Sequence, residues 1–155
     1  MKTIKKHFPA VIFITGLIAA LFSLMPVLSY QGATFRGYEI ILGGEIFNLN
    51  PFNLGSVASA YLPFSWSALA AFFLPLLAGA IMLYTKRLIV VSTSLFIISV
   101  VLFIMMPEAI EIIYVIAGTE SSSAVEWNLE AGYIGGLTTS VIGSLLNIVL
   151  IMKKV

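Results

Sequence analysis

Four apolar stretches constrain this chain more than any other feature of its sequence. They cover about residues 8–28, 63–84, 88–106 and 131–152. An α-helix rises 1.5 Å per residue, so each stretch is long enough to cross a hydrocarbon core of about 30 Å. Away from their ends, none of them contains Asp, Glu, Lys, Arg or His. We therefore predict four transmembrane helices.

Composition and length indicate one membrane domain. Hydrophobic residues make up 60% of the chain and charged residues 10%, which is far from the usage of soluble proteins. The expected fold is an all-α membrane protein: a four-transmembrane-helix bundle over residues 1–155, with outer connections at about 30–62 and 107–130. A cleavable signal peptide is the alternative for the first stretch, but small residues are not well placed for cleavage.

The charged residues are segregated along the chain. All seven acidic residues are glutamates in the two longer connections. Basic flanks stay on the cytoplasmic side of a membrane, so we predict a cell-membrane protein with cytoplasmic termini. The preference for Lys over Arg and the lack of N-x-S/T acceptors favour a bacterial inner membrane. Seven of the eight basic residues lie at the termini or in one short turn: Lys2, Lys5, Lys6, Lys86, Arg87, Lys153 and Lys154.

The first outer connection has the pattern of a small extracytoplasmic β-hairpin. Residues 34–42 are rich in aromatic and β-branched side chains, Gly43-Gly44 predicts a tight turn, and extended patterning resumes over 45–49. Asn50-Pro51 ends this pattern.

The segments that follow the two halves of this pattern carry further expectations. Residues 52–61 predict a short interfacial helix before the second span. Residues 112–117 are apolar turns expected to project outside and rest against the hairpin, and 118–123 predict a flexible polar loop.

The last apolar stretch carries two rows of small or polar residues. On a helix, residues four apart lie on one face. In lipid, close approach at small residues supplies the attraction between helices. We predict a helix-packing surface and favour packing within the chain's own bundle over dimerisation. Its residues are Gly132, Gly136, Ser140 and Ser144 in one row, and Gly135, Thr139, Gly143 and Asn147 in the other.

Pro75 lies in the middle of the second stretch. A proline inside a helix removes one N–H, so it is predicted to kink the helix and to free a carbonyl group. In lipid that carbonyl must be satisfied by a neighbouring helix.

Glu108 and Glu111 are three residues apart at the end of the third stretch. If the helix continues, the two carboxylates share a face and form a cation site or a partner site at the outer mouth of the bundle. The simpler alternative, which we prefer, is two solvated carboxylates that end a membrane helix.

Missing residue types exclude several classes of site. The chain has no Cys and no Asp, and one His. It therefore has no disulfide, no thiolate metal site and no aspartate dyad. We predict no catalytic, metal or cofactor site, and we favour a non-enzyme over an enzyme. Basic residues confined to one side of a membrane favour anionic lipid headgroups over nucleic acid as their partner.

The leading functional hypothesis is a non-catalytic multi-pass membrane protein. Its outer loops or helix faces would engage a membrane protein partner or another copy of itself. The alternative is a passive channel or uncoupled transporter subunit, with Glu108 or Glu111 as the outer selectivity group. A third, weaker hypothesis is a lipid-modifying enzyme that uses the same glutamates as acid or base.

The layout resembles that of claudin-type tetraspans. The shared features are four spans, both ends inside, a long extended first outer loop and a third helix that runs past the membrane. The Trp and paired-Cys signature of that family's first loop is missing here, since the chain has no Cys. The resemblance therefore concerns layout alone.

Overall fold

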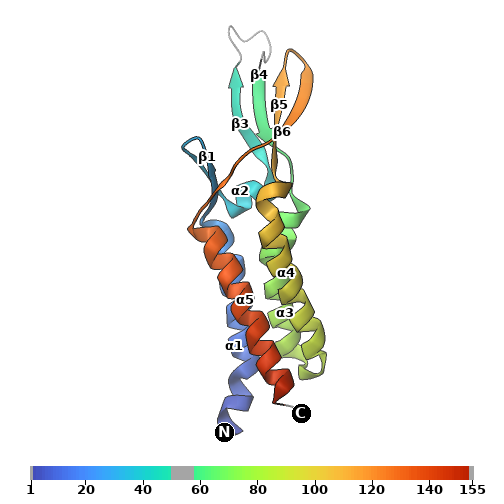
Figure 1. The fold of residues 1–155 in the computed structure, drawn as a ribbon. Coiled ribbons are helices and arrows are strands. Elements are labelled where there is room, and N and C mark those ends of the chain that lie inside the picture. Colours follow the sequence, from blue (N-terminus) through green and yellow to red (C-terminus); the bar gives the residue numbers. More distant parts are fainter. Residues whose placement is uncertain (1, 50–57, 154–155) are drawn as a thin grey trace.

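Four long helices occupy one end of the molecule, and strands occupy the other (Figure 1). The computed structural model describes residues 2–49 and 58–153, with side chains from residue 7 onward. The helices are α1 (Lys2–Leu21), α3 (Trp66–Tyr84), α4 (Ile89–Ala109) and α5 (Ala131–Met152). Each contains a segment long and apolar enough to cross a membrane. The prediction of four such helices is therefore confirmed in length and composition.

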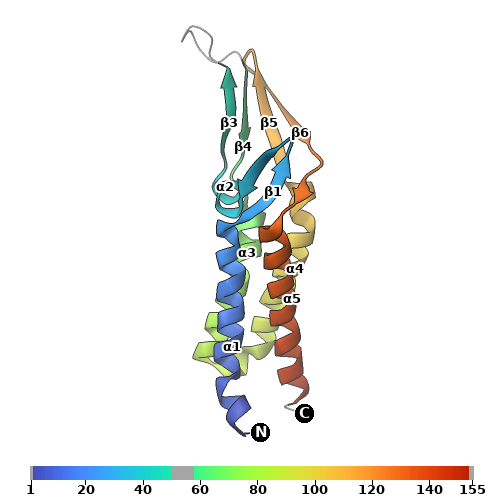
Figure 2. The ribbon, with the colours of Figure 1, turned by 90° about the vertical axis from the view of Figure 1, so that its left-hand side faces the viewer.

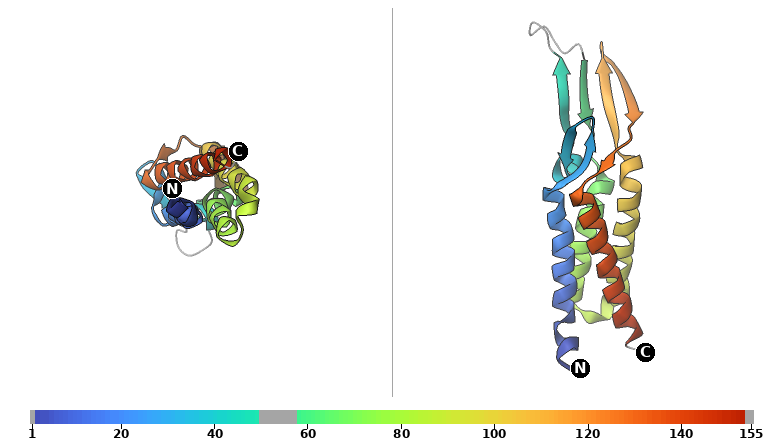
Figure 3. Two further views of the ribbon diagram at one scale, coloured as in Figure 1. Left: turned by 90° about the horizontal axis from the view of Figure 1, so that it is seen from below. Right: turned by 60° about the vertical axis from the view of Figure 1, so that its left-hand side comes forward.

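The helices form a closed ring, seen from below in Figure 3. α1 packs against α3 and α5, and α4 packs against α3 and α5. A 3₁₀ turn, η3 (Lys86–Leu88), joins α3 to α4. Both chain ends and this turn lie at the end of the bundle away from the strands (Figure 1). The basic clusters are therefore gathered at one end of the molecule.

The prediction of an all-α fold is wrong. The protein is mixed α/β, with 64% helix and 24% strand. It has two antiparallel sheets, with strand orders β2-β1-β7 and β3-β4-β5-β6. The strands are β1 (Pro26–Tyr30), β2 (Ala33–Arg36), β3 (Gly44–Leu49), β4 (Ala58–Leu62), β5 (Glu111–Ile116), β6 (Thr119–Ala124) and β7 (Asn128–Leu129). Each sheet combines strands from both outer connections, which is how the two loops become one structure.

The predicted hairpin was wrong in its turn and in its first strand. Much of that strand forms a helix, α2 (Gly37–Leu42), and Gly43 follows it with φ of 73° instead of turning a hairpin. β3 begins at Gly44 but pairs with β4. The predicted interfacial helix fails at its end, because Ala58–Leu62 is a strand; residues 52–57 lie outside the described part.

The second connection also differs from its prediction. Residues 112–117 were expected as helical turns, yet Glu111–Ile116 is strand β5, which does lie against the first connection by pairing with β4. The predicted polar loop at 118–123 is mostly strand β6. The first helix ends earlier than expected, at Leu21, with a 3₁₀ turn η1 (Phe22–Leu24) and β1 after it.

We call the described residues 26–49, 58–62 and 110–130 the head. Its larger sheet projects well beyond the helices, whereas β1 and β2 lie in front of its lower part (Figure 2). The core of the head is continuous with the upper core of the bundle: Val27, Leu28, Leu62 and Ile112 are buried in one cluster with Phe72 and Phe103. A second cluster, which contains Ile12, Met82 and Phe96, fills the lower bundle.

Candidate functional site

The predicted packing rows on α5 lie inside the chain's own bundle. Six of their eight residues are buried, and Gly135 and Thr139 are half-buried. A Cβ on Gly132 would lie 2.6 Å from the Pro26 carbonyl oxygen, and one on Gly135 would overlap the Phe22 ring. The upper end of the rows therefore packs on the segment that leads out of α1.

Farther down, the glycines of α5 receive aromatic rings from α4. A Cβ on Gly136 would lie 2.6 Å from the Phe103 ring, and a Cβ on Gly143 would overlap the Phe96 ring. Phe103 also packs edge-on against Phe72 of α3, with ring centroids 4.8 Å apart. Gly136 and Gly143 thus make room for rings rather than for a neighbouring backbone.

Close contact between the backbones of two long helices occurs between α1 and α3. A Cβ on Gly16 would overlap the carbonyl oxygen of Pro75, and a Cβ on Gly79 would lie 2.7 Å from Phe13 Cα. Neither glycine can accept a side chain without separating the helices, because backbone atoms cannot rotate away. Gly79 was not predicted as a packing residue; a small-residue search of the second span, matched to Gly16 in the first, would have found it.

An upper polar layer joins α3, α4 and α5. The Ser99 hydroxyl donates a hydrogen bond to the Ala71 carbonyl oxygen at 2.6 Å. Ala71 is four residues before Pro75, so its carbonyl is the one that the proline frees. The Ser140 hydroxyl lies 3.1 Å from Ser99 Oγ and 2.9 Å from its own helix's Gly136 carbonyl, and it donates to one at a time. The predicted neighbour that satisfies the freed carbonyl is therefore Ser99.

A lower polar layer repeats this arrangement one heptad away. The Ser92 hydroxyl donates to the Ala78 carbonyl oxygen at 2.9 Å and accepts a hydrogen bond from Asn147 Nδ2, also at 2.9 Å. Each member is seven residues from its counterpart in the upper layer, which is about two helical turns. Asn147 is fully buried, and its Oδ1 has no hydrogen-bond partner among the described residues. The lower layer therefore contains one buried acceptor, Asn147 Oδ1, that no described residue satisfies.

The two layers alternate with the ring contacts. Along α4 the order is Phe103, Ser99, Phe96, Ser92, and along α5 it is Gly136, Ser140, Gly143, Asn147. Both series have spacings of four, three and four, which keep one face of each helix toward the other. The sequence predicted the α5 series but not the α4 series. The serines of α4 stand among large apolar residues and do not form a small-residue row.

Glu108 and Glu111 are not brought together as predicted. Glu108 is in the last turn of α4, which ends at Ala109, and Glu111 is the first residue of β5. Helical spacing does not apply between them, so the predicted shared helix face is wrong. Both side chains are exposed. They lie where the bundle meets the head.

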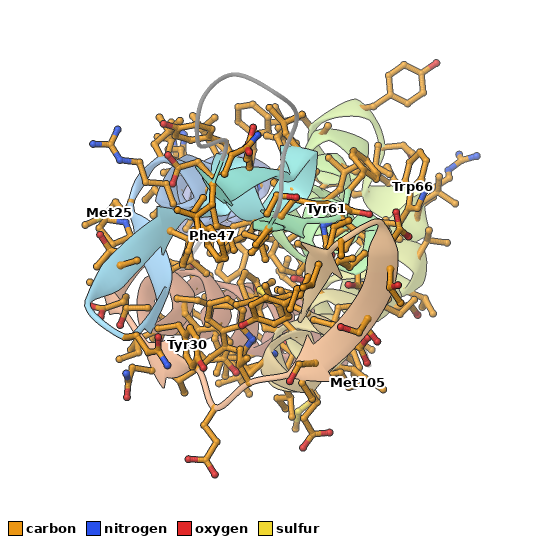
Figure 4. The ribbon with its side chains drawn as sticks, turned by 90° about the horizontal axis from the view of Figure 1, so that it is seen from above. Met25, Tyr30, Phe47, Tyr61, Trp66 and Met105 are labelled. Atoms are coloured by element: carbon orange, nitrogen blue, oxygen red, sulfur yellow. The ribbon has the colours of Figure 1, made fainter. Side chains whose placement is uncertain are left out.

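The larger sheet of the head has an apolar face at its far end. Register pairs Phe47 of β3 with Ala60 of β4 and Ala60 with Tyr114 of β5; one step along, Leu49 pairs with Ala58 and Ala58 with Ile116. Phe47, Leu49 and Ile116 are 42%, 60% and 59% exposed. We call these three residues the apolar patch. Seen from above, Phe47 lies near the middle of the head, whereas Met25, Trp66 and Met105 lie around its outside (Figure 4).

Aromatic side chains join the small sheet to the segment after β6. Trp127 packs edge-on against Tyr30 and Phe35, with centroids 5.9 and 5.7 Å away, and its Nε1 donates to the Ile110 carbonyl oxygen at 3.0 Å. Ser29 Oγ donates to Glu130 Oε1 at 2.6 Å beside them.

Burial, and then repulsion and hydrogen bonding from Tyr30, raise the pKa of Tyr114 above its ordinary value.

In residues 2–49 and 58–153 no three His, Asp or Glu side chains gather as metal ligands. The buried hydroxyls are hydrogen-bonded to backbone or to each other.

Comparisons with protein-family models, with curated proteins and with solved structures find no match to this chain.

Proposed function

We propose that this protein is a non-catalytic, multi-pass membrane protein whose helices anchor a head that binds a protein partner. The head would lie on the outer side of a cell membrane, with both chain ends in the cytoplasm. The proposal rests on the distribution of apolar side chains and of charge, and on the shape of the head.

The outward surface of the bundle supports the membrane part of this proposal. Large apolar side chains are exposed on all four helices, among them Ile14, Leu77, Ile104 and Leu145. Exposure of this many large apolar side chains is unfavourable in water and favourable in lipid. Basic residues at the chain ends and at η3 favour the cytoplasm for that end.

Trp66 supports the same placement. It is 74% exposed at the head end of α3 and packs against Phe64. Exposed aromatic rings gather where a membrane meets water. The head would therefore begin at about this level and project into the aqueous phase.

The observation that carries the proposed function is the apolar patch. A water-exposed sheet face usually carries polar residues, and a cluster of exposed large apolar side chains marks an interaction site. Phe47, Leu49 and Ile116 come from two strands and lie on one face, so a partner can contact all three at once.

A passive channel has less support. Its path would run between the helices, where Phe72, Phe96 and Phe103 are fully buried. The serines of the two layers make their hydrogen bonds within the bundle. No specific observation favours conduction over assembly.

The test is extraction of tagged protein under gentle conditions, followed by mass measurement. We expect a stoichiometric complex with a partner, lost when Phe47, Leu49 and Ile116 are changed to serine and retained when the exposed Ser94 of α4 is changed to alanine. A monomer from the unaltered chain contradicts the proposal.

A further inference from the structure

β6 is an edge strand whose outer side is open. It pairs with β5 over all six of its residues without a register shift, and all six are exposed. In the described part of the chain, no other strand pairs with its outer edge. Edge strands are commonly protected by charged side chains, above all lysine, by proline, by a bulge or by short length. β6 reads Thr-Glu-Ser-Ser-Ser-Ala, so its one charged residue is Glu120, and it has no lysine, proline or bulge.

The opposite edge of the same sheet is protected. β3 has a register shift between Glu45 and Phe47, where one residue bulges out of its pairing with β4. A bulge bends an edge and disrupts the row of free backbone groups. The two edges are therefore not equivalent, and an added strand fits β6.

The turn before β6 identifies which of its backbone groups face outward. Ala117 and Gly118 have φ of 49° and 81°, which is the pattern of a two-residue type I′ turn. The pair that closes such a turn, Ile116 and Thr119, is hydrogen-bonded, and bonded and unbonded pairs then alternate. Glu120, Ser122 and Ala124 therefore direct their N–H and C=O groups away from β5.

Charge indicates what kind of strand fits there. The head contains six glutamates, Glu39, Glu45, Glu111, Glu120, Glu126 and Glu130, and one base, Arg36, so six negative charges and one positive give a formal charge of −5. Glu120 lies within β6 itself, and its side chain and that of Glu111 fall on the same face of the sheet by register. A basic segment complements this edge.

We propose that β6 accepts an extended, lysine- or arginine-bearing segment of a partner protein as an added strand of the larger sheet. The partner's backbone pairs with Glu120, Ser122 and Ala124, and a basic side chain faces Glu120. Small serine side chains leave the edge accessible. A second copy of β6 is a poorer occupant, because it brings another Glu120 and no base. This inference rests on the proposed function and names the class of partner.

The test uses the full chain in zwitterionic nanodiscs and a synthetic peptide of alternating lysine and threonine. We expect the peptide to protect the amide protons of Glu120, Ser122 and Ala124 from exchange, and to leave those of Ser121 and Ser123, which already bond to β5, unchanged. A peptide of alternating glutamate and threonine should bind at least about tenfold more weakly.

Two variants separate backbone pairing from charge. Ser122→Pro removes one outward N–H and is tolerated at a sheet edge; it should weaken peptide binding at least about tenfold, whereas Ser122→Ala should leave it unchanged. Glu120→Gln keeps the backbone and should weaken binding about threefold to tenfold, with a smaller dependence on salt. Uniform amide protection, equal binding of both peptides, or Ser122→Pro binding like the unaltered protein overturns the proposal.

The native complex distinguishes this inference from the proposed function. If the complex is lost on mutation of the apolar patch but survives Ser122→Pro, the head binds a partner by another surface and the inference is wrong. If the unaltered chain yields no complex, the proposed function fails. A homo-oligomer broken by Ser122→Pro assigns the edge to a second copy and overturns the basic partner.

Discussion

In the bundle, buried serines bond to groups of the same chain, whereas in the head one sheet edge has no paired strand among the described residues. Ser99 satisfies the carbonyl that Pro75 frees, and Ser92 bridges Ala78 to Asn147. β6, by contrast, is exposed along its whole length. Serines that bond within the bundle and a sheet edge that stays open in the head are what we expect of an anchor that carries a recognition surface.

The largest expected effect tests how tightly the bundle is closed. Gly16→Leu would force a side chain into the Pro75 carbonyl, so we expect it to lower the free energy of unfolding by about 3 kcal/mol or more. Thermal unfolding in detergent measures this. Gly44→Ala in the head is the control, since a Cβ there meets nothing within 4 Å, and its effect should stay within about 0.5 kcal/mol. Equal stability of the two variants contradicts the close α1–α3 crossing.

The next effect tests the upper polar layer. Ser99→Ala leaves the Ala71 carbonyl buried and unpaired, which should cost about 1–3 kcal/mol. In a Pro75→Ala background the restored N–H can reach that carbonyl, so the cost of Ser99→Ala should fall there. Ser94→Ala is the matched control, because that serine is exposed and bonds only to Val90 of its own helix. The same cost in both backgrounds would show that the serine does not act through the proline.

Asn147→Ser tests the lower layer and should have a smaller effect. It makes this layer resemble the upper one and removes the unpaired Oδ1, which offsets part of the loss of packing. We expect unfolding free energy to change by less than about 1 kcal/mol. A loss as large as that of Ser99→Ala would mean that Oδ1 has a bonding partner after all.

The turn of the β5–β6 hairpin offers an effect in the opposite direction. Ala117 adopts a left-handed conformation that costs an ordinary L-residue about 1–2 kcal/mol. Ala117→Asn should recover up to about 1 kcal/mol, since asparagine tolerates this conformation, and amide exchange in β6 should slow. Gly118→Ala should act in the reverse sense, because its φ is 81°. Faster exchange in Ala117→Asn would contradict the turn assignment.

The smallest effect concerns alkaline pH. Because the pKa of Tyr114 is raised above its value of about 10 in the unfolded chain, its neutral form stabilises the fold. This contribution is complete below pH 10 and is lost as pH rises through the folded pKa. Carbon-13 spectra of the tyrosine rings should show Tyr114 ionising at higher pH than free tyrosine, and Tyr30→Phe should reduce the difference. Titration of Tyr114 at the ordinary value would contradict its contact with Tyr30.

The helices were predictable because lipid-length apolar runs and Pro75 carry strong local signals. The sheets were not, because their signals are weak or contradictory. The hairpin turns are Gln31-Gly32 and Ala117-Gly118, which lack the Asn-Gly or Asp-Gly pattern typical of such turns. Gly43-Gly44 carries a stronger turn signal in the sequence than either pair. β6 contains no large apolar residue, so its pairing with β5 could be found only in three dimensions. Residues 37–42 read as strand yet form a helix. The Arg36 N–H donates to Glu39 Oε2 at 2.7 Å and caps its first turn, and Gly37 packs on Ser23, so capping and tertiary contact override propensity.

Labelling of single cysteines tests the anchor-and-head account most directly, and the chain has no native Cys to interfere. Cysteines replace Ser122 in the head, Lys86 in η3 and Lys153 near the chain end, and intact cells are treated with a membrane-impermeant maleimide. We predict labelling of the position-122 variant alone, with the other two reacting only after the membrane is opened. Labelling of position 86 or 153 in intact cells, or protection of position 122, would contradict the account.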